Sequence, residues 1–458
     1  MHLLSSLAWL AIGANAWSVD FSSKTDVQAG TKPEHKSGIH KGKIDGKCAS
    51  TVKQCYYSLG YYPNWGVYAK KYFVTDIPAD HFTHLSYAFA NVNNKTGEVY
   101  LSDTYADLQY AYPGDDTKAK GNNLYGNLKQ LYKLKKNNRY LNTLLAVGGF
   151  TYSPNIALVL GSEHKRETFA KSAVKLVSDL AFDGLDIDYE YVANSREAEQ
   201  MVDLLRRLRE GLDKLNRDSK ATAPFLLTFA SPAGEDHYKV LDFPKMTPYV
   251  DLFNFMAVDY AGASFSKKTG YLDNLYRDKK NPASTPFDTQ SGIHYYLHEG
   301  KVPGSKIVIQ NPLYGSAFNN TNGIGQPFKD AGTLGSLGTP GTWFIKDLPP
   351  PEFNLKVTSN PAVGGSYSYD KAKKYLIAHD TPDVVRQKVE YVKEKKLAGT
   401  AFWEISQDRK ITNDAQNPSL ISTAIVGYGG VAALEKRENN LLYPLSIYDN
   451  IRKGLPEN

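Results

Sequence analysis

The sequence predicts an α/β fold, a (β/α)8 TIM barrel with a small α+β insertion between strands 7 and 8. Short apolar runs alternate along the chain with segments of helical periodicity, which is typical of parallel β/α units. There are eight such runs, the number that a closed barrel needs. A chain of 458 residues is long enough for one barrel with an insertion. The expected strands are residues 57–62, 83–90, 142–148, 182–190, 225–231, 250–258, 306–313 and 398–404.

The first residues have the pattern of a secretory leader. An apolar run over residues 3–13 is followed by Ala14-Asn-Ala16, an A-x-A-like cleavage site, so residues 1–16 are expected to be a signal peptide. Residues 17–54 are polar, rich in Lys, Gly and Ser, and without periodicity, and we expect a polar, basic N-terminal arm. No later stretch has the eighteen apolar residues of a membrane helix. The mature protein should therefore be secreted and extracellular, without a membrane span.

Charge and cysteine content limit the possible partners. The net charge of +6 is modest for this length, and no basic patch with a recognition motif is present, so we expect no nucleic-acid partner. We also expect the protein to be a monomer. Cys48 and Cys55, separated by six residues, either form a disulfide or leave Cys55 simply buried at the first strand. Asn94-Lys-Thr96 and Asn319-Asn-Thr321 are candidate glycosylation sites.

Helical periodicity is clearest after the fourth strand. Asn194 is placed to cap that helix, with Glu197 at the third position. An earlier helix is expected over about 162–180. The apolar stripe of the capped helix recurs at three- and four-residue steps and consists of Met201, Leu204, Leu205, Leu208, Leu212 and Leu215.

The gap between the seventh and eighth strands is longer than one connecting helix. Residues of about 316–380 are rich in Gly, Pro and Tyr, which favours a small, largely antiparallel insertion that forms one wall of a cleft. Residues 382–396 have the pattern of an ordinary barrel helix. The barrel should therefore span 55–430, and residues 431–458 are expected to form a C-terminal tail.

The decapeptide Phe182-Asp-Gly-Leu-Asp-Ile-Asp-Tyr-Glu-Tyr191 carries four acids on the expected fourth strand. Because a strand projects alternate residues to opposite faces, Asp186, Asp188 and Glu190 should point the same way. Three ionised carboxylates in one inward row would repel one another and lose hydration, so at least one should hold a proton near neutral pH. A neutral carboxylic acid beside carboxylates is suited to protonating a leaving group.

The acid row has two alternative interpretations. Asp-x-Asp-x-Glu could bind a divalent cation through oxygen ligands, but the spacing does not fit a twelve-residue calcium loop, and a rigid strand supplies ligands from one direction only. An exposed acidic strand edge is the second alternative. Phe182, Leu185 and Ile187, which lie between the acids, favour a buried outer face instead.

The spacing Asp-x-x-Asp-x-Asp-x-Glu followed by an aromatic residue is the signature of glycoside hydrolase family 18. From about Gly60 to Gly430, the chain resembles the secreted fungal chitinases of that family. Further motifs of the family occur in the expected order: Gly60-Tyr-Tyr-Pro-Asn-Trp65, Thr83-His-Leu-Ser-Tyr-Ala-Phe-Ala-Asn91, Val147-Gly-Gly-Phe-Thr-Tyr-Ser153, Ala230-Ser-Pro-Ala-Gly234, Met256-Ala-Val-Asp-Tyr260, Pro312-Leu-Tyr-Gly315 and Trp403-Glu404.

The resemblance implies a role for each acid, with no metal and no cofactor. Glu190 would be the general acid and then the base, Asp188 would hold the substrate's acetamido group, Asp186 would share a proton with Asp188, and Asp183 would support the strand from its buried end. The attacking atom would be the acetamido oxygen of the sugar itself. The residues expected to bind substrate are Tyr61, Trp65, Gly148, Gly149, Tyr191, Met256, Asp259, Tyr260, Tyr314 and Trp403.

The sequence departs from the family pattern at several of these motifs. Val258 stands where relatives usually have Tyr, and Ala146 where they have Ser; Tyr189, Asn311 and Ser316 replace Trp, Met and Arg. The leading prediction is an extracellular endo-acting chitinase that cleaves the β-1,4 bonds of chitin or chito-oligosaccharides with retention. The alternatives are a weakened, lectin-like chitin-binding protein and a family 18 hydrolase of another N-acetylhexosamine glycan.

Overall fold

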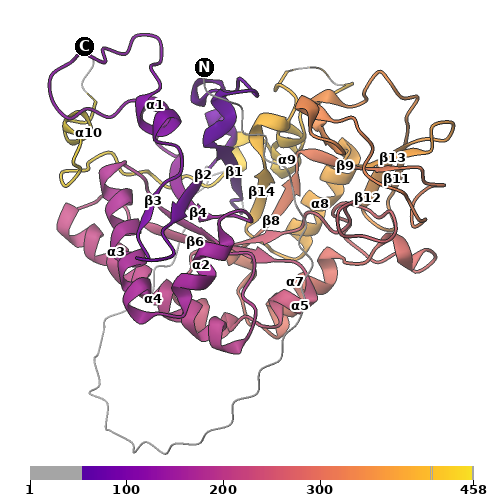
Figure 1. The fold of residues 1–458 in the computed structure, drawn as a ribbon, viewed down its shortest axis with the longest axis horizontal. Coiled ribbons are helices and arrows are strands. Elements are labelled where there is room, and N and C mark those ends of the chain that lie inside the picture. Colours follow the sequence, from indigo (N-terminus) through magenta and orange to yellow (C-terminus); the bar gives the residue numbers. More distant parts are fainter. Residues whose placement is uncertain (1–53, 413, 415, 456–458) are drawn as a thin grey trace, which may run out of the picture. The chain divides into compact units, whose positions relative to one another are not determined.

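The computed structural model describes residues 54–412, 414 and 416–455, and within them a closed parallel barrel forms (Figure 1). Each of the eight predicted strands is present, which confirms the predicted fold class. The closed order is β1-β14-β8-β7-β6-β5-β4-β2, with β2 pairing back to β1. The strands are β1 (Tyr57–Pro63), β2 (His84–Val92), β4 (Asn142–Gly148), β5 (Gly184–Asp188), β6 (Leu226–Pro232), β7 (Leu252–Met256), β8 (Ile307–Pro312) and β14 (Gly399–Trp403).

The predicted signal peptide and residues 17–53 of the predicted arm lie outside the described residues, as does Cys48. Cys55 takes part in a disulfide bond. A short strand, β3 (Val99–Leu101), adds to β2 in antiparallel orientation outside the barrel.

Helices cover the barrel because its strands present apolar residues outward. Leu185 and Ile187 of β5, for example, belong to the core between the sheet and the helices. The helices are α1 (Gly126–Asn137), α2 (Ser153–Leu160), α3 (Glu163–Asp179), α4 (Ser195–Ser219), α5 (Glu235–Tyr238), α6 (Phe243–Met246), α7 (Thr289–His298), α8 (Pro382–Glu394), α9 (Leu420–Tyr428) and α10 (Asp449–Arg452).

The cap predicted for the longest helix is present. The Asn194 side chain accepts a hydrogen bond from the N–H of Glu197 at 3.0 Å, and α4 begins at the next residue after Asn194. Its leucine stripe is buried, as the three- and four-residue spacing predicted.

The insertion between β8 and β14 is a five-stranded antiparallel sheet, which appears in orange in Figure 1. Its order is β10-β9-β13-β12-β11, and α8 follows it as the expected barrel helix. The strands are β9 (Tyr314–Asn319), β10 (Thr342–Phe344), β11 (Lys356–Asn360), β12 (Gly365–Asp370) and β13 (Tyr375–Ala378).

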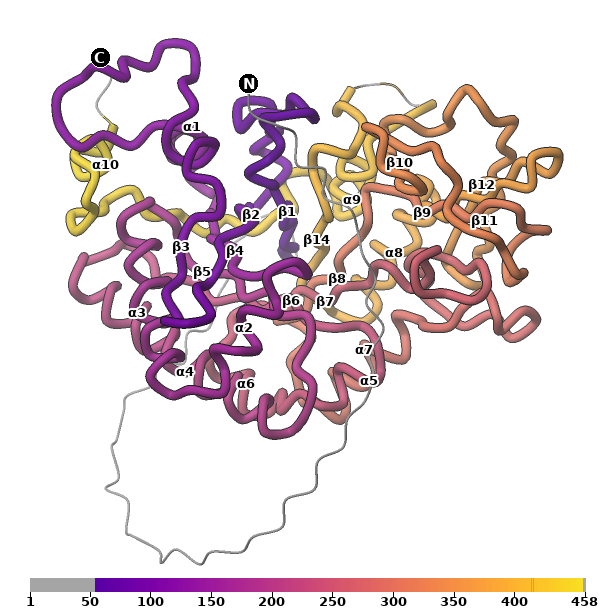
Figure 2. The backbone as a smooth tube through the Cα atoms, viewed as in Figure 1, coloured from indigo at the N-terminus to yellow at the C-terminus, as the bar shows by residue number. Residues whose placement is uncertain are grey.

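The C-terminal segment, residues 431–455, packs against the barrel rather than extending from it. The yellow chain in Figure 2 runs beside α1 and ends in α10, and two contacts agree with that course: Tyr132 donates to Leu441 O at 2.6 Å, and Asn122 N–H donates to Asp449 at 2.8 Å. Tyr443 is buried. The residues expected as a tail thus contribute to the folded core.

Candidate active site

The acid row lies at the C-terminal end of β5, inside the barrel. Asp186 and Asp188 face inward because Leu185 and Ile187 pack outward, and Glu190 follows the strand by two residues. Asp186 is fully buried and Asp188 is 5% exposed. The structure therefore brings these three carboxyl groups together at the end of the barrel where catalytic groups of this fold are found.

Asp186 is held by polar groups from neighbouring strands. Its Oδ1 accepts hydrogen bonds from Thr228 Oγ1 at 2.6 Å and from Asn254 Nδ2 at 3.1 Å, and the same amide contacts the Tyr61 hydroxyl at 3.1 Å. Burial raises the pKa of Asp186, and hydrogen bonds, that of Thr228 foremost, oppose the rise. Its Oδ2 has no hydrogen-bond partner among the described residues, which leaves this oxygen free to share a proton.

Asp188 is positioned through its backbone by two glycines. The carbonyl oxygen of Asp188 accepts from the N–H of Gly149 at 2.8 Å. Gly148 has φ of 113°, and a Cβ there would lie 2.0 Å from that same oxygen. Only glycine fits such an approach. The Gly148–Gly149 pair, predicted to bind substrate, thus sets the end of β4 against Asp188.

Glu190 has the pKa that the proton-donor role requires. Burial raises the pKa of Glu190 to about 7, and the nearby Asp259 adds to the rise, while hydrogen bonds from Tyr191 and from the Phe150 backbone oppose it. The pKa of Asp188 lies well above its usual range because of burial and of the adjacent Glu190 and Asp186. A substantial fraction of Glu190 therefore carries its proton at neutral pH, where an ordinary glutamate is ionised.

The loop after β4 fixes the main chain at Glu190. The N–H of Glu190 donates to Ser153 Oγ at 2.8 Å, and that hydroxyl donates to the carbonyl of Gly149 at 2.9 Å. Ser153 is buried at the start of α2. The carboxyl group thus stands on a backbone that is anchored to the neighbouring strand.

Aromatic side chains form the floor beside the acids. Trp403, the last residue of β14, stacks on Phe89 at 5.6 Å between ring centroids and meets the edge of Tyr61 at 5.4 Å. Trp65 lies 6.4 Å from Phe89 and is 40% exposed. A stacked indole that keeps one open face matches the apolar C–H surface of a pyranose ring.

The wall formed by β7 and β9 carries a carboxyl–phenol pair. Tyr314 donates to Asp259 Oδ1 at 2.7 Å; Tyr314 is buried, whereas Asp259 is exposed to solvent. Desolvation by the surrounding protein raises the pKa of Asp259, and the Tyr314 hydrogen bond opposes that rise. Met256 ends β7 and is 9% exposed. These three predicted residues surround the acids from the side opposite β4.

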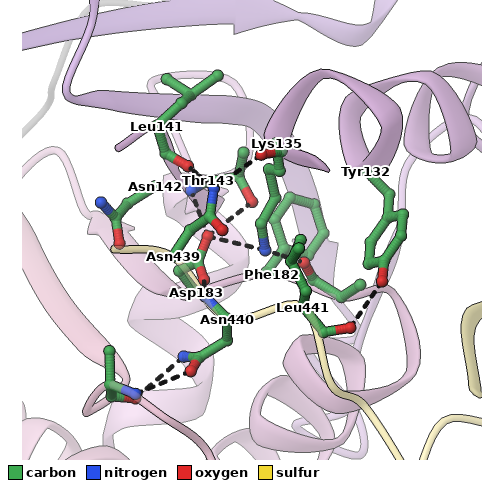
Figure 3. Close-up of polar contacts among 12 residues, drawn as sticks. Tyr132, Lys135, Leu141, Asn142, Thr143, Phe182, Asp183, Asn439, Asn440 and Leu441 are labelled. Atoms are coloured by element: carbon green, nitrogen blue, oxygen red, sulfur yellow. Dashed lines mark hydrogen bonds and ion pairs between the residues drawn. The ribbon is translucent and has the colours of Figure 1, made fainter. Parts of the chain in front are cut away.

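Three predicted site residues have other partners. Tyr260 turns away and shares a hydrogen bond with Thr289 at the start of α7, at 2.9 Å. Tyr191 stacks on His237 with ring centroids 4.2 Å apart, next to Glu190. Asp183 precedes β5 and pairs with Lys135 at 2.8 Å (Figure 3), at the end of the strand opposite the acid row. Asp183 therefore supports the strand and stands apart from the other acids.

Two residues that the sequence reading missed complete the site. Thr228 and Asn254 hold Asp186, and both lie on inward positions of β6 and β7. Asn254 had a visible signal, since it is the only polar residue in the strand Leu252-Phe-Asn-Phe-Met256. The departure at Ala146, opposite Asp186 in the β4–β5 register, has a counterpart in Thr228, which lies opposite Asp186 on the other side.

In the described part of the chain, no group of three or more His, Cys, Asp or Glu is arranged to hold a metal ion. None of the helices between residues 54 and 455 is both long and apolar enough to cross a membrane.

The sequence profile "Glycosyl hydrolases family 18" matches residues 58–408. "Chitinase 1" of Aphanocladium album is 41% identical over 395 residues, which cover 86% of this chain and 90% of that protein. "Endochitinase 1" of Metarhizium robertsii is 41% identical over 401 residues, covering 87% and 91%. Among solved structures, chitinase ChiA74 from Bacillus thuringiensis is similar with a TM-score of 0.74 and 26% identity, over 82% of this chain and 70% of that one.

Proposed function

Because the chain belongs to glycoside hydrolase family 18, we propose that it is an extracellular, endo-acting chitinase. It hydrolyses the β-1,4 bonds of chitin and of N-acetylglucosamine oligomers with retention of configuration. Relatives that match nearly the whole chain are named chitinases or endochitinases, which supports this substrate class.

The observation that carries the proposal is Glu190, a half-buried carboxyl group with a pKa of about 7 beside two buried acids, Asp186 and Asp188. A proton donor works best when its pKa is close to the operating pH. Glu190 protonates the glycosidic oxygen as the bond to the anomeric carbon breaks, and it later removes a proton from the incoming water.

The acetamido group of the sugar provides the nucleophile. Its carbonyl oxygen attacks the anomeric carbon and forms a cyclic oxazolinium ion, which water then opens with net retention. Asp188 Oδ1, buried and without a hydrogen-bond partner among the described residues, is suited to accept the acetamido N–H and to stabilise the positive intermediate. A proton shared by Asp186 and Asp188 reduces the repulsion between the two carboxylates.

Val258 stands where family members usually have Tyr, so the acetamido pocket of this chain lacks one hydroxyl group. A phenol at this position would hydrogen-bond the acetamido oxygen, and loss of one such bond costs about 1–3 kcal/mol, roughly ten- to a hundredfold in rate. Asp259 and Tyr314 remain next to Val258 as polar groups of the pocket. We expect a working enzyme with modest turnover.

Digestion of chitotetraose and colloidal chitin tests the proposal. The wild type should release shorter oligosaccharides, and Glu190→Gln should release none while still binding the sugar. Glu210→Gln, on the exposed face of α4, is the matched control and should behave like the wild type. Sugar binding without any products from the wild type would instead favour the lectin-like alternative. Proton NMR of the fresh product should show the β-anomer first, and an initial α-anomer would exclude the retaining mechanism.

Secretion and glycosylation belong to the same proposal. The predicted leader supports export. Asn94 and Asn319, the two candidate acceptors, are each partly buried and donate to Asn155 and Asp330 at 2.9 Å. Mass spectrometry of the secreted protein before and after glycosidase treatment shows whether Asn94 and Asn319 carry glycans.

A further inference from the structure

Away from the acid row, one lysine is buried between two carboxylates. Lys388 of α8 is 1% exposed, and Asp273 and Asp380 are each 2% exposed. Lys388 Nζ donates to Asp380 Oδ2 at 2.6 Å and also to Asp273 Oδ2. The three residues, the Lys388 cluster, come from α8, from the segment between β7 and α7, and from the residues that follow β13. The cluster therefore joins a barrel helix, a barrel loop and the insertion sheet.

The Asp273 side of this cluster leads back to the site through the main chain. The N–H of Tyr260 donates to the carbonyl of Leu272 at 2.9 Å, so Asp259 and Asp273 flank one backbone hydrogen bond. Asp259 accepts the hydroxyl of Tyr314 at 2.7 Å. Because Lys388 binds Asp273, it also restrains the neighbouring segment that carries Asp259, through the Tyr260–Leu272 hydrogen bond.

The Asp380 side leads to the same place through the insertion sheet. Strands β9 and β13 pair with Ser316 opposite Ala378. Tyr314 precedes Ser316 by two residues and Asp380 follows Ala378 by two, so both lie at the same end of this antiparallel pair. Lys388 therefore binds both chain segments that lead to the Asp259–Tyr314 pair, one through the Tyr260–Leu272 hydrogen bond and the other through the β9–β13 pairing.

Such a cluster contributes little to net stability, because desolvation of buried charges offsets most of their attraction. Its effect is on geometry. Two carboxylates around one ammonium fix both chain segments against α8, and Asp380 Oδ1 has no further partner in the described chain. The negative charge of Asp273 also raises the pKa of Asp259, although desolvation by the surrounding protein has the larger effect.

We propose that Lys388, Asp273 and Asp380 are positioning residues of the active site: they hold the Asp259–Tyr314 pair of the pocket wall in register with Glu190. The inference rests on the proposed function, since it is read out through turnover. In this proposal the insertion has a second role besides forming one wall of the cleft. It fixes the position of the Tyr314–Asp259 hydrogen bond.

A double-mutant cycle between Asp273→Asn and Tyr314→Phe tests the proposal. Each single variant should lower kcat/KM on chitotetraose about tenfold. The double variant should also lose about tenfold, because both changes release the same pair. Asp383→Asn, at the exposed start of α8, is the control and should match the wild type. A loss of about a hundredfold in the double variant, or none for Asp273→Asn, would overturn the proposal.

Substitutions of Lys388 provide a second test of the positioning role. Lys388→Arg, which keeps the cation, should retain more activity than Lys388→Met, and the Met variant should show the same non-additivity with Tyr314→Phe. If Asp273→Asn does not fold by near-UV circular dichroism, Lys388→Arg replaces it in the cycle. A wild type without turnover on any chito-oligosaccharide would refute the proposed function, whereas additive losses in an active enzyme refute only this positioning role.

Discussion

The ion pair at the closed end of the barrel allows a quantitative test of stability. Lys135 is fully buried, and its ammonium donates to Ala181 O at 2.7 Å and to the Tyr443 hydroxyl at 2.8 Å, besides its pairing with Asp183 at 2.8 Å. We consider Lys135→Met, which keeps the length and removes the charge. Loss of one partner of a buried ion pair typically costs about 3–5 kcal/mol of unfolding free energy.

The surroundings of Asp183 place the expected value at the lower end of that range. In Lys135→Met, the Asp183 carboxylate would still accept hydrogen bonds from the N–H groups of Thr143 and Asn440, each at 2.8 Å, so its charge would remain partly compensated (Figure 3). We expect Lys135→Met to lose about 3 kcal/mol, on the order of a hundredfold in the unfolding equilibrium.

Urea unfolding followed by circular dichroism measures this loss. Lys133→Met, an exposed position on the same helix, should stay within about 0.5 kcal/mol of the wild type. Turnover of folded Lys135→Met should be unchanged, because Asp183 precedes Asp188 by five strand residues, roughly 16 Å. A loss below about 1 kcal/mol, or an equal loss for Lys133→Met, would show that the buried pair does not contribute as argued.

Two further predictions concern the site. Since Glu190 must carry its proton and its pKa is about 7, kcat/KM should fall about tenfold per pH unit above 7; the apparent value belongs to the coupled Glu190–Asp188 pair, and a plateau up to pH 9 would refute Glu190 as the acid. Val258→Tyr should raise kcat on chitotetraose by roughly ten- to a hundredfold through the restored hydrogen bond, and Val258→Phe, which lacks the hydroxyl, should not; equal rates for both would mean that the pocket is already compensated.

Fold and acid row were accessible from the sequence because both depend on local patterns. Each barrel strand is a short apolar run, and strict alternation places Asp186 and Asp188 on one face whatever the rest of the chain does. The strand bounds differ where the chain leaves the sheet. Strand four was expected over 182–190, but β5 covers Gly184–Asp188, since Asp183 pairs with Lys135 and Glu190 is turned by the bond to Ser153.

The contribution of the C-terminal segment could not be read from the sequence. The polar stretch Glu435-Lys-Arg-Glu-Asn-Asn440 indicated a tail, although the apolar residues on either side of it could have signalled packing. In the structure, Asn439 Nδ2 donates to the carbonyls of Lys135 at 3.1 Å, Asn138 at 3.0 Å and Leu141 at 2.7 Å, around the end of α1. Contacts between a side chain and a distant backbone leave no periodic signal. The Lys388 cluster escaped prediction for the same reason, since Asp273 and Lys388 are 115 positions apart.

The two ends of β5 show why similar acids in one decapeptide have different roles. Asp183 is surrounded by donors, two backbone N–H groups and an ammonium, so its charge is fully compensated and contributes to folding. Asp186 and Asp188 each keep an unpartnered buried oxygen within the described structure, and the pKa of Glu190 is raised to about 7. Such groups destabilise the fold until a ligand or a proton satisfies them, which is expected of catalytic groups. The ammonium of Lys135 beside Asp183, more than residue type, therefore separates the supporting acid from the reactive ones.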